Sequence, residues 1–234
     1  MPKKLTKRFK MIKEKVDSSK SYTLLEAVNI LKSLPKARFD ETVELALKMG
    51  LDVKHSDQQL RGTVVFPHGI GKIKRILVFA KGDKETEARD AGADFVGGEE
   101  LIDKIKAGWS DFDVAIATPD MMKFVGKLGK VLGPKGMMPN PKTGTVTMQI
   151  EKAVREFKSG KVEFRTDKFA NMQIGVGKIS FDAPKLVENI VELMDLIWKM
   201  KPASAKGTYI RSLTISTTMG PGLKISLDSI RKAA

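Results

Sequence analysis

The chain has 234 residues, with 42 Lys and Arg against 28 Asp and Glu, a net charge of +14 at pH 7 and no Cys. The lack of Cys excludes disulfide scaffolds, Cys-ligated metals and thiol catalysis, and no segment resembles a signal peptide or the roughly 18 apolar residues of a membrane span. The length allows one large domain or two small ones, and the charge indicates a polyanionic partner for a cytoplasmic protein.

The excess of positive charge is concentrated near the two ends of the chain. Residues 1–20 hold eight basic and two acidic side chains, and residues 201–234 hold six basic and one acidic. Such runs are either solvated tails or, if both belong to one folded unit, a surface for phosphates. Charge alone leaves both interpretations open.

An apolar stripe within the basic start has two interpretations of its own. Leu5, Phe9, Ile12 and Val16 recur at helical spacing but form only a narrow stripe. Such a stripe is compatible with weak membrane contact or with docking on the body of the protein.

The next segment is predicted to be a helix followed by two strands. Thr23 and Glu26 have the spacing of a capping box, and apolar residues at helical spacing follow them. Residues 39–49 alternate in polarity, with Phe39 and Glu41 on the same side as the apolar positions. This alternation predicts a half-buried strand, and residues 62–66 predict a second one.

The pattern changes after His68. Short apolar runs at residues 76–80, 94–97 and 114–117 are each followed by a charged segment of helical character. These helical segments span residues 85–91, 99–107 and 120–132. Repetition of strand and helix at this spacing predicts a parallel sheet covered by helices.

Short alternating strands return after Gly160. They are expected at residues 161–165, 172–176 and 209–217, with a helix opened by Asp182 and Pro184 between the last two. Neither outer piece is large enough to bury a core by itself. The sequence therefore predicts an α/β protein with a discontinuous α+β domain, residues 1–67 and 160–234, and an inserted strand–helix domain, residues 68–159.

Glycine-rich loops introduce the alternative of a nucleotide-dependent enzyme. Gly71-Lys72 resembles the end of a phosphate-binding loop, but Ile73 stands where that loop needs Ser or Thr. The Gly-x-Gly pairs at residues 175–177 and 220–222 lack the third glycine of a dinucleotide fingerprint. The residues thus predict no active site, although saturable nucleotide binding by residues 68–160 would favour the enzyme.

Two other segments have compositions that suit RNA. Residues 133–144 contain three Pro, three Gly, Lys135, Lys142 and no acid, which describes either a rigid basic loop for RNA backbone or an ordinary connection. Residues 216–220 place hydroxyls, a Met and a Gly side by side. Recognition of folded RNA by 2′-OH hydrogen bonds and close backbone approach requires such groups.

Several segments of the chain, taken together, match one family. They are Phe39–Glu44, Ser56–Gln58 with Arg61 and Gly62, Pro67–Gly69, residues 133–144, Ala205–Gly207 and Ser216–Gly220. Over essentially the whole chain they resemble the bacterial L-one family of ribosomal proteins, the stalk proteins of the large subunit. The resemblance implies a two-layer discontinuous domain, an inserted Rossmann-like domain, no enzymatic activity, no cofactor and no metal.

The resemblance also implies partners. They are the large-subunit (23S) rRNA at the mobile stalk, tRNA at the exit site of the ribosome, and the mRNA of the protein's own operon, whose translation the protein would repress. No membrane and no small-molecule substrate is implied, and the protein would be a monomer when free of the ribosome.

The family's RNA contacts can be transferred to matching positions of this chain. The principal contact comprises Phe39, Thr42, Asp167, Lys168, Ser212, Thr217, Thr218, Met219 and Gly220, and a looser contact with RNA or tRNA comprises Lys72, Lys74, Lys135 and Lys142. The apolar members would pack on sugars or bases, the hydroxyls would bond 2′-OH or phosphate groups, and the glycine would allow close backbone approach. The chain departs from the family pattern after Lys168, where Phe169 is either a new stacking group or part of the core.

Overall fold

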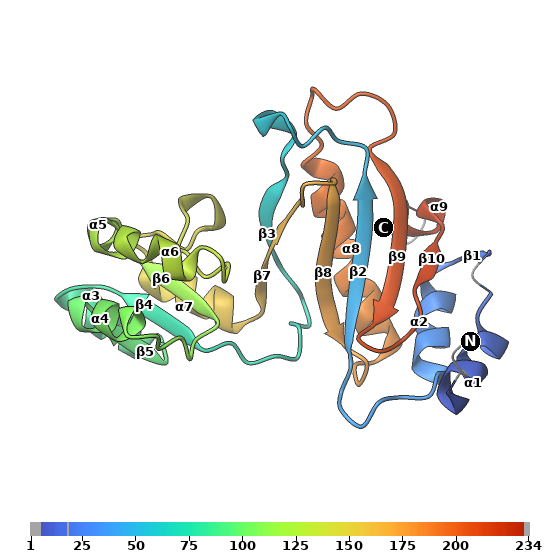
Figure 1. Cartoon of the computed structure of the whole chain (residues 1–234), viewed down its shortest axis with the longest axis horizontal. Coiled ribbons are helices and arrows are strands. Elements are labelled where there is room, and N and C mark those ends of the chain that lie inside the picture. The colour runs from blue at the N-terminus through green and yellow to red at the C-terminus, as the bar shows by residue number, and fades with distance from the viewer. Residues whose placement is uncertain (1–5, 18, 232–234) are drawn as a thin grey trace, which may run out of the picture. The chain divides into compact units, whose positions relative to one another are not determined.

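The structure is a computed structural model that describes residues 6–17 and 19–231 (Figure 1). It divides into two compact units. One unit comprises the chain up to Gly71 together with the chain from Phe164 onward, and the other comprises Lys72–Glu163. Two strands that pair with each other, β3 (Arg61–Val65) and β7 (Lys161–Arg165), lie where the chain leaves the first unit and returns to it.

The discontinuous unit is built on a five-stranded sheet with the order β1-β10-β9-β2-β8. Its further elements are α1 (Lys7–Lys15), β1 (Ser21–Tyr22), α2 (Leu24–Ser33), β2 (Thr42–Met49), the short 3-10 helix η1 (Ser56–Gln58), β8 (Asn171–Lys178), α8 (Ala183–Lys199), β9 (Ile210–Thr217), β10 (Leu223–Ile225) and α9 (Leu227–Arg231). Strand β2 is antiparallel to both β8 and β9, so segments from both parts of the chain form the centre of the sheet.

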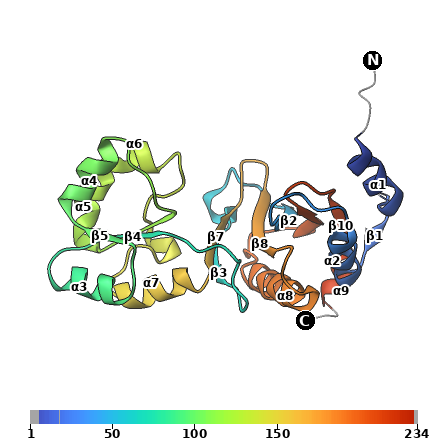
Figure 2. The same ribbon diagram turned by 90° about the horizontal axis from the view of Figure 1, so that it is seen from below.

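Helices α2 and α8 cover one face of this sheet (Figure 2). The alternation of β2 follows from this arrangement, since Val43, Leu45 and Leu47 are buried against the helices while Glu44 and Lys48 are exposed. Side chains on the uncovered face of the neighbouring strands, such as Gln173 and Ser212, are exposed as well. The unit therefore has two layers, with one polar sheet face.

The two main helices begin and pack as the sequence predicts. In α2, the Thr23 hydroxyl accepts a hydrogen bond from the Glu26 amide at 3.4 Å, and the Glu26 carboxylate accepts one from the Thr23 amide at 3.1 Å, which completes the capping box. Helix α8 has Pro184 in its first turn and buries one apolar side chain per turn. The buried set is Leu186, Ile190, Leu193, Met194 and Ile197.

The inserted unit has three layers around a parallel sheet with the order β5-β4-β6. Its elements are β4 (Ile76–Phe79), α3 (Asp83–Asp90), β5 (Phe95–Gly97), α4 (Glu99–Lys106), β6 (Val114–Ala117), η2 (Pro119–Met121), α5 (Met122–Val125), η3 (Gly126–Leu128), α6 (Gly129–Leu132), η4 (Pro141–Thr143) and α7 (Ile150–Lys158). Helices α4, α5 and α6 cover one face and α3 and α7 the other (Figure 2), and every residue of β4 is fully buried.

The predicted fold class is confirmed, while several elements differ from the sequence prediction. The alternation predicts Phe39 on the apolar side of a strand, but β2 begins at Thr42 and Phe39 is 53% exposed. Helix α7, which supplies much of the core beneath the inserted sheet, was not predicted. Two glycines divide the expected helix of residues 120–132 into short pieces, η3 starting at Gly126 and α6 at Gly129.

The apolar stripe near the start of the chain lies on α1. Ile12 is buried, Val16 is half-buried and Phe9 is 43% exposed, whereas Leu5 lies outside the described residues. Burial of Ile12 shows that this helix docks on the body of the protein. Among residues 6–17 and 19–231, no helix combines the length and the apolar character that crossing a membrane requires.

Candidate RNA interface

Six of the nine predicted principal contacts lie at one end of the five-stranded sheet, where β2 begins and β9 ends. We call this set the threonine end: Phe39, Thr42, Thr217, Thr218, Met219 and Gly220. Val43 pairs with Thr217 in the register of β2 and β9. Beyond that pair, the Thr218 amide donates to the Thr42 carbonyl at 3.0 Å, and the Thr42 amide donates to the Thr218 hydroxyl at 3.0 Å. The turn after β9 is thus tied to the start of β2.

A buried carboxylate organises the threonine end. The side chain of Glu41 is only 3% exposed, and it accepts hydrogen bonds from the amides of Ala37 at 2.7 Å and Met219 at 3.3 Å. Nη2 of Arg8 lies 3.0 Å from the same carboxylate and 3.3 Å from the Met219 carbonyl. Glu41 therefore joins helix α1, the loop before β2 and the turn after β9.

The electrostatics of this carboxylate result from opposing effects. Burial raises the pKa of Glu41, but hydrogen bonds from the Thr217 hydroxyl and the two amides, together with the charge of Arg8, lower it more. The net pKa of Glu41 lies below its ordinary value, so the carboxylate stays ionised near neutral pH. The Thr217 hydroxyl is consequently engaged inside the protein.

The exposed groups of the threonine end are therefore a subset of the predicted residues. Met219 is 58% exposed and Phe39 is 53% exposed, and Thr218 is exposed beside them. A Cβ atom on Gly220 would collide with Oγ1 of Thr217, so the turn itself requires glycine at this position. The end presents two apolar side chains on a fixed backbone, and the exposed Thr218 beside them bonds the Thr42 amide and carbonyl through its hydroxyl.

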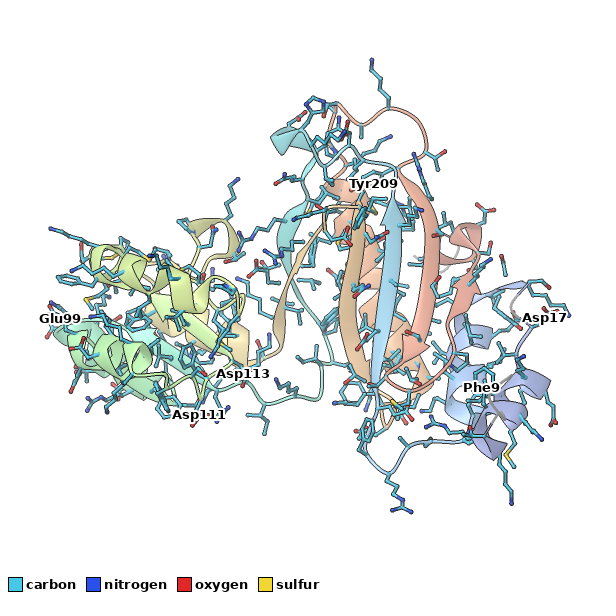
Figure 3. All side chains as sticks on the ribbon, in the orientation of Figure 1. Phe9, Asp17, Glu99, Asp111, Asp113 and Tyr209 are labelled. Atoms are coloured by element: carbon cyan, nitrogen blue, oxygen red, sulfur yellow. The ribbon has the colours of Figure 1, made fainter. Side chains whose placement is uncertain are left out.

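The other three predicted principal contacts lie at the opposite end of the sheet. We call Asp167, Lys168 and Ser212 the aspartate end. Lys48, near the end of β2, pairs with both Asn171 and Ser212. Thr42 and Lys48 are six residue steps apart on β2, which at about 3.4 Å per step is a distance of about 20 Å. The nine residues therefore form two separate groups at the two ends of one sheet (Figure 1), with the aspartate end near Tyr209, labelled in Figure 3.

The four lysines of the looser contact differ in how far they are engaged within the inserted unit. Lys72 pairs with Asp113 at 2.7 Å, and Lys135 donates to the Ser110 hydroxyl at 2.7 Å. Lys74 donates to the Lys161 carbonyl, and burial, followed by the charge of Lys72, lowers its pKa. Within the described part of the chain, Lys142 alone of the four has an ammonium with no hydrogen bond or ion pair.

The proline-glycine loop that carries Lys135 and Lys142 has a defined conformation. The side-chain oxygen of Asn140 accepts a hydrogen bond from the backbone amide of Lys142 at 2.8 Å, and the backbone amide of Asn140 donates to the Thr145 hydroxyl at 2.7 Å. Gly136 and Gly144 have φ values of 71° and 70°, in the left-handed region that favours glycine. The loop is therefore built as a rigid connection, in agreement with its composition.

Sequence reasoning missed Arg8 and Glu41 as parts of the site. The available signal was a carboxylate at position 41 on the apolar side of the alternating pattern, because a buried charge requires partners. Within the described residues, no cluster of three or more His, Cys, Asp or Glu side chains is arranged to hold a metal ion.

Comparison with known proteins identifies the family of the chain. Residues 31–221 match the profile of the Ribosomal protein L1p/L10e family. The large ribosomal subunit protein uL1 of Protochlamydia amoebophila (strain UWE25) is 57% identical over 229 residues, which cover 98% of this chain and 97% of that protein. The resemblance stated from the sequence is confirmed, and the alternative of a nucleotide-dependent enzyme is wrong. The chain belongs to the ribosomal protein L1p/L10e family and is a structural, ribosome-associated protein rather than an enzyme.

Proposed function

We propose that this protein is a constituent of the large ribosomal subunit that binds 23S rRNA at the mobile stalk near the tRNA exit site. The name and high identity of the uL1 relative support the subunit assignment. The discontinuous domain, residues 1–67 and 160–234, would carry the principal RNA contact, and the inserted Rossmann-like domain, residues 68–159, a looser one. The net charge of +14 supports a partner rich in phosphates.

The preorganised threonine end is the observation on which this proposal depends. Met219 and Phe39 are large, solvent-exposed apolar side chains. The backbone that carries Met219 is fixed by hydrogen bonds to the Glu41 carboxylate and the Thr42 carbonyl. A site whose backbone is already ordered loses little conformational entropy when RNA binds. Apolar contact with sugars and bases, with a hydroxyl beside it, is a mode of recognising folded RNA by shape.

The aspartate end and the four lysines complete the proposed contacts. Asp167, Lys168 and Ser212 would contact the same RNA at the far end of the sheet. Lys72, Lys74, Lys135 and Lys142 would approach further RNA or tRNA loosely, with Lys142 the most available of them. Contacts of this kind add salt-dependent affinity with little specificity.

We further propose that the same surface serves translational control. An mRNA segment of the protein's own operon that folds like the ribosomal site would compete for the threonine end and be repressed when the protein is in excess. The free protein would act as a monomer. A competition assay tests this part of the proposal: an rRNA fragment and an mRNA fragment should displace each other from the protein, and each should bind it with one-to-one stoichiometry.

Titration of variants against folded stalk RNA and an unrelated hairpin, at several salt concentrations, tests the main proposal. Thr218→Ala and Met219→Ala are expected to weaken binding to stalk RNA by a few kcal/mol at most and to leave hairpin binding unchanged. Thr86→Ala and Met148→Ala, which alter exposed side chains of the inserted unit, are matched controls and should bind like the wild type. Equal losses on both RNAs would contradict specific recognition by the threonine end.

A further inference from the structure

The turn between β7 and β8 holds its conformation through a single carboxylate. Asp167 accepts hydrogen bonds from the amides of Phe169 and Asn171, both at 2.8 Å, and from the Asn171 side chain at 3.2 Å. Its own amide donates to the Asn171 carbonyl at 2.8 Å. The hydrogen bond from the Asn171 amide is the main reason that the pKa of Asp167 is lowered. Asp167 is thus occupied with shaping the turn.

The turn is also fixed to the sheet through Ala170. This residue adopts a left-handed conformation with φ of 57°, the one non-glycine residue of the described chain to do so. Its side chain is buried at 4% exposure, and its carbonyl accepts the amide of Met49, at the end of β2, at 2.8 Å. A left-handed Ala persists only where the surroundings hold it. The residues on either side of the apex are therefore anchored.

Phe169 projects from this anchored turn into solvent. Its side chain is 79% exposed, and among the large apolar side chains of the described residues only Ile73 is more exposed. No aromatic pair or cation–π contact within the described chain includes its ring. The core-packing alternative for Phe169 is therefore wrong, and a partner would meet a free, positioned ring.

The groups around this turn indicate what that partner is. Lys48 lies at the end of β2 in register with Asn171, and Arg211 precedes Ser212 on β9. Lys48, Lys168 and Arg211 are all exposed, and none lies within 4.0 Å of a carboxylate in the part of the chain that the structure describes. Free cations beside an exposed aromatic ring and a hydroxyl match the composition of surfaces that bind unpaired nucleotides.

We infer that Phe169 is a base-stacking residue, which packs its ring on an unpaired base of the bound RNA while Lys48, Lys168 and Arg211 contact the adjacent phosphates. The inference rests on the proposed function and extends it by naming the stacking group of the contact at the aspartate end, about 20 Å from the threonine end. Two contacts at a fixed separation favour an RNA whose fold presents its binding groups at the same separation. A ring held by an ordered turn stacks without the entropy loss of fixing a mobile loop.

A panel of full-length variants bound to folded stalk RNA tests the inference. Phe169→Ala and Phe169→Leu are both expected to weaken binding by about tenfold, and Phe169→Tyr is expected to bind like the wild type, since stacking requires an aromatic face. The slope of log affinity against log salt concentration should not change, because no phosphate contact is removed. Ultraviolet crosslinking should join position 169 to one nucleotide.

Controls separate this inference from the function on which it rests. Met148→Ala, at an exposed apolar side chain of the inserted unit, should leave binding unchanged, and thermal unfolding should confirm that all variants are folded. If Thr218→Ala weakens binding but Phe169→Ala stays within twofold of the wild type, or if Phe169→Leu retains full affinity, stacking by Phe169 is overturned and the proposed function stands. If the wild type does not prefer stalk RNA to an unrelated hairpin, both fail.

Discussion

Arg8 and Glu41, 33 positions apart in the chain, form an ion pair in which Nη2 of the arginine lies 3.0 Å from Oε1 of the glutamate. The Glu41 side chain is 3% exposed and the Arg8 side chain 30%, so the glutamate is buried and the arginine is partly exposed. The same carboxylate accepts the Met219 amide. An interaction made inside the protein therefore determines the position of a side chain proposed to contact RNA.

Removal of the Glu41 carboxylate should destabilise the fold and disorder the threonine end. Glu41→Ala leaves the amides of Ala37 and Met219 and the charge of Arg8 without their acceptor, which is expected to reduce the free energy of unfolding by about 2–4 kcal/mol. Arg8→Ala should cost less, about 1 kcal/mol, because the arginine is partly solvated. Urea unfolding measures both, and a smaller loss for Glu41→Ala than for Arg8→Ala would contradict this assignment.

The stability of the protein should depend on pH through Glu41. Its pKa in the folded state is lowered, so the unfolded chain binds more protons over the interval between the two pKa values. The stabilisation by Glu41 is then fully present above its ordinary pKa of 4.5 and is lost as the pH falls through the lower folded value. The difference in unfolding free energy between the wild type and Glu41→Gln should therefore shrink below about pH 4.5. A constant difference from pH 3 to pH 7 would argue against this role.

A buried amide should stabilise the segment between β3 and the inserted unit. Asn189 is fully buried on α8, and its side chain donates to the carbonyls of Gly69 at 3.0 Å and Val176 at 2.8 Å and accepts the His68 amide at 3.3 Å. Asn189→Ala is expected to lower the free energy of unfolding by about 2–3 kcal/mol, since three backbone groups lose their partner, one of them the buried carbonyl of Val176. Asn29→Ala, at an exposed position of α2, is the control and should be nearly neutral in the same assay.

The lysines of the inserted unit should differ in their effect on RNA binding. Lys142→Gln is expected to weaken binding to all RNAs alike and to reduce the salt slope by about one, as expected for the loss of one phosphate contact. Lys74→Gln should change the slope less, because the Lys74 ammonium already donates to the Lys161 carbonyl. Salt titrations of both variants provide the comparison. A larger change for Lys74→Gln would show that its buried position does not persist in the complex.

Local sequence patterns were sufficient for most elements of the fold. The capping box at Thr23 and Glu26, the one-per-turn apolar residues of α8 and the strand–helix repetition of the inserted unit all depend on neighbouring residues. Such local patterns did not predict where strand β2 begins. Phe39 continues the alternation of β2, yet the strand begins at Thr42, and the buried Glu41 before it bonds the amides of Ala37 and Met219.

Residue identity and short-range periodicity were enough to predict the family, the α/β class and the residues of the proposed RNA contact. They did not predict that Thr218 lies beside Thr42, that both are separated from Asp167 by the length of a strand, or that Phe169 is exposed on an anchored turn. These relations result from strand pairing. Antiparallel register brings residues more than 170 positions apart in the chain into contact. The extended backbone of a strand keeps the residues at its two ends about 20 Å apart. Neither relation can be read from the local sequence pattern.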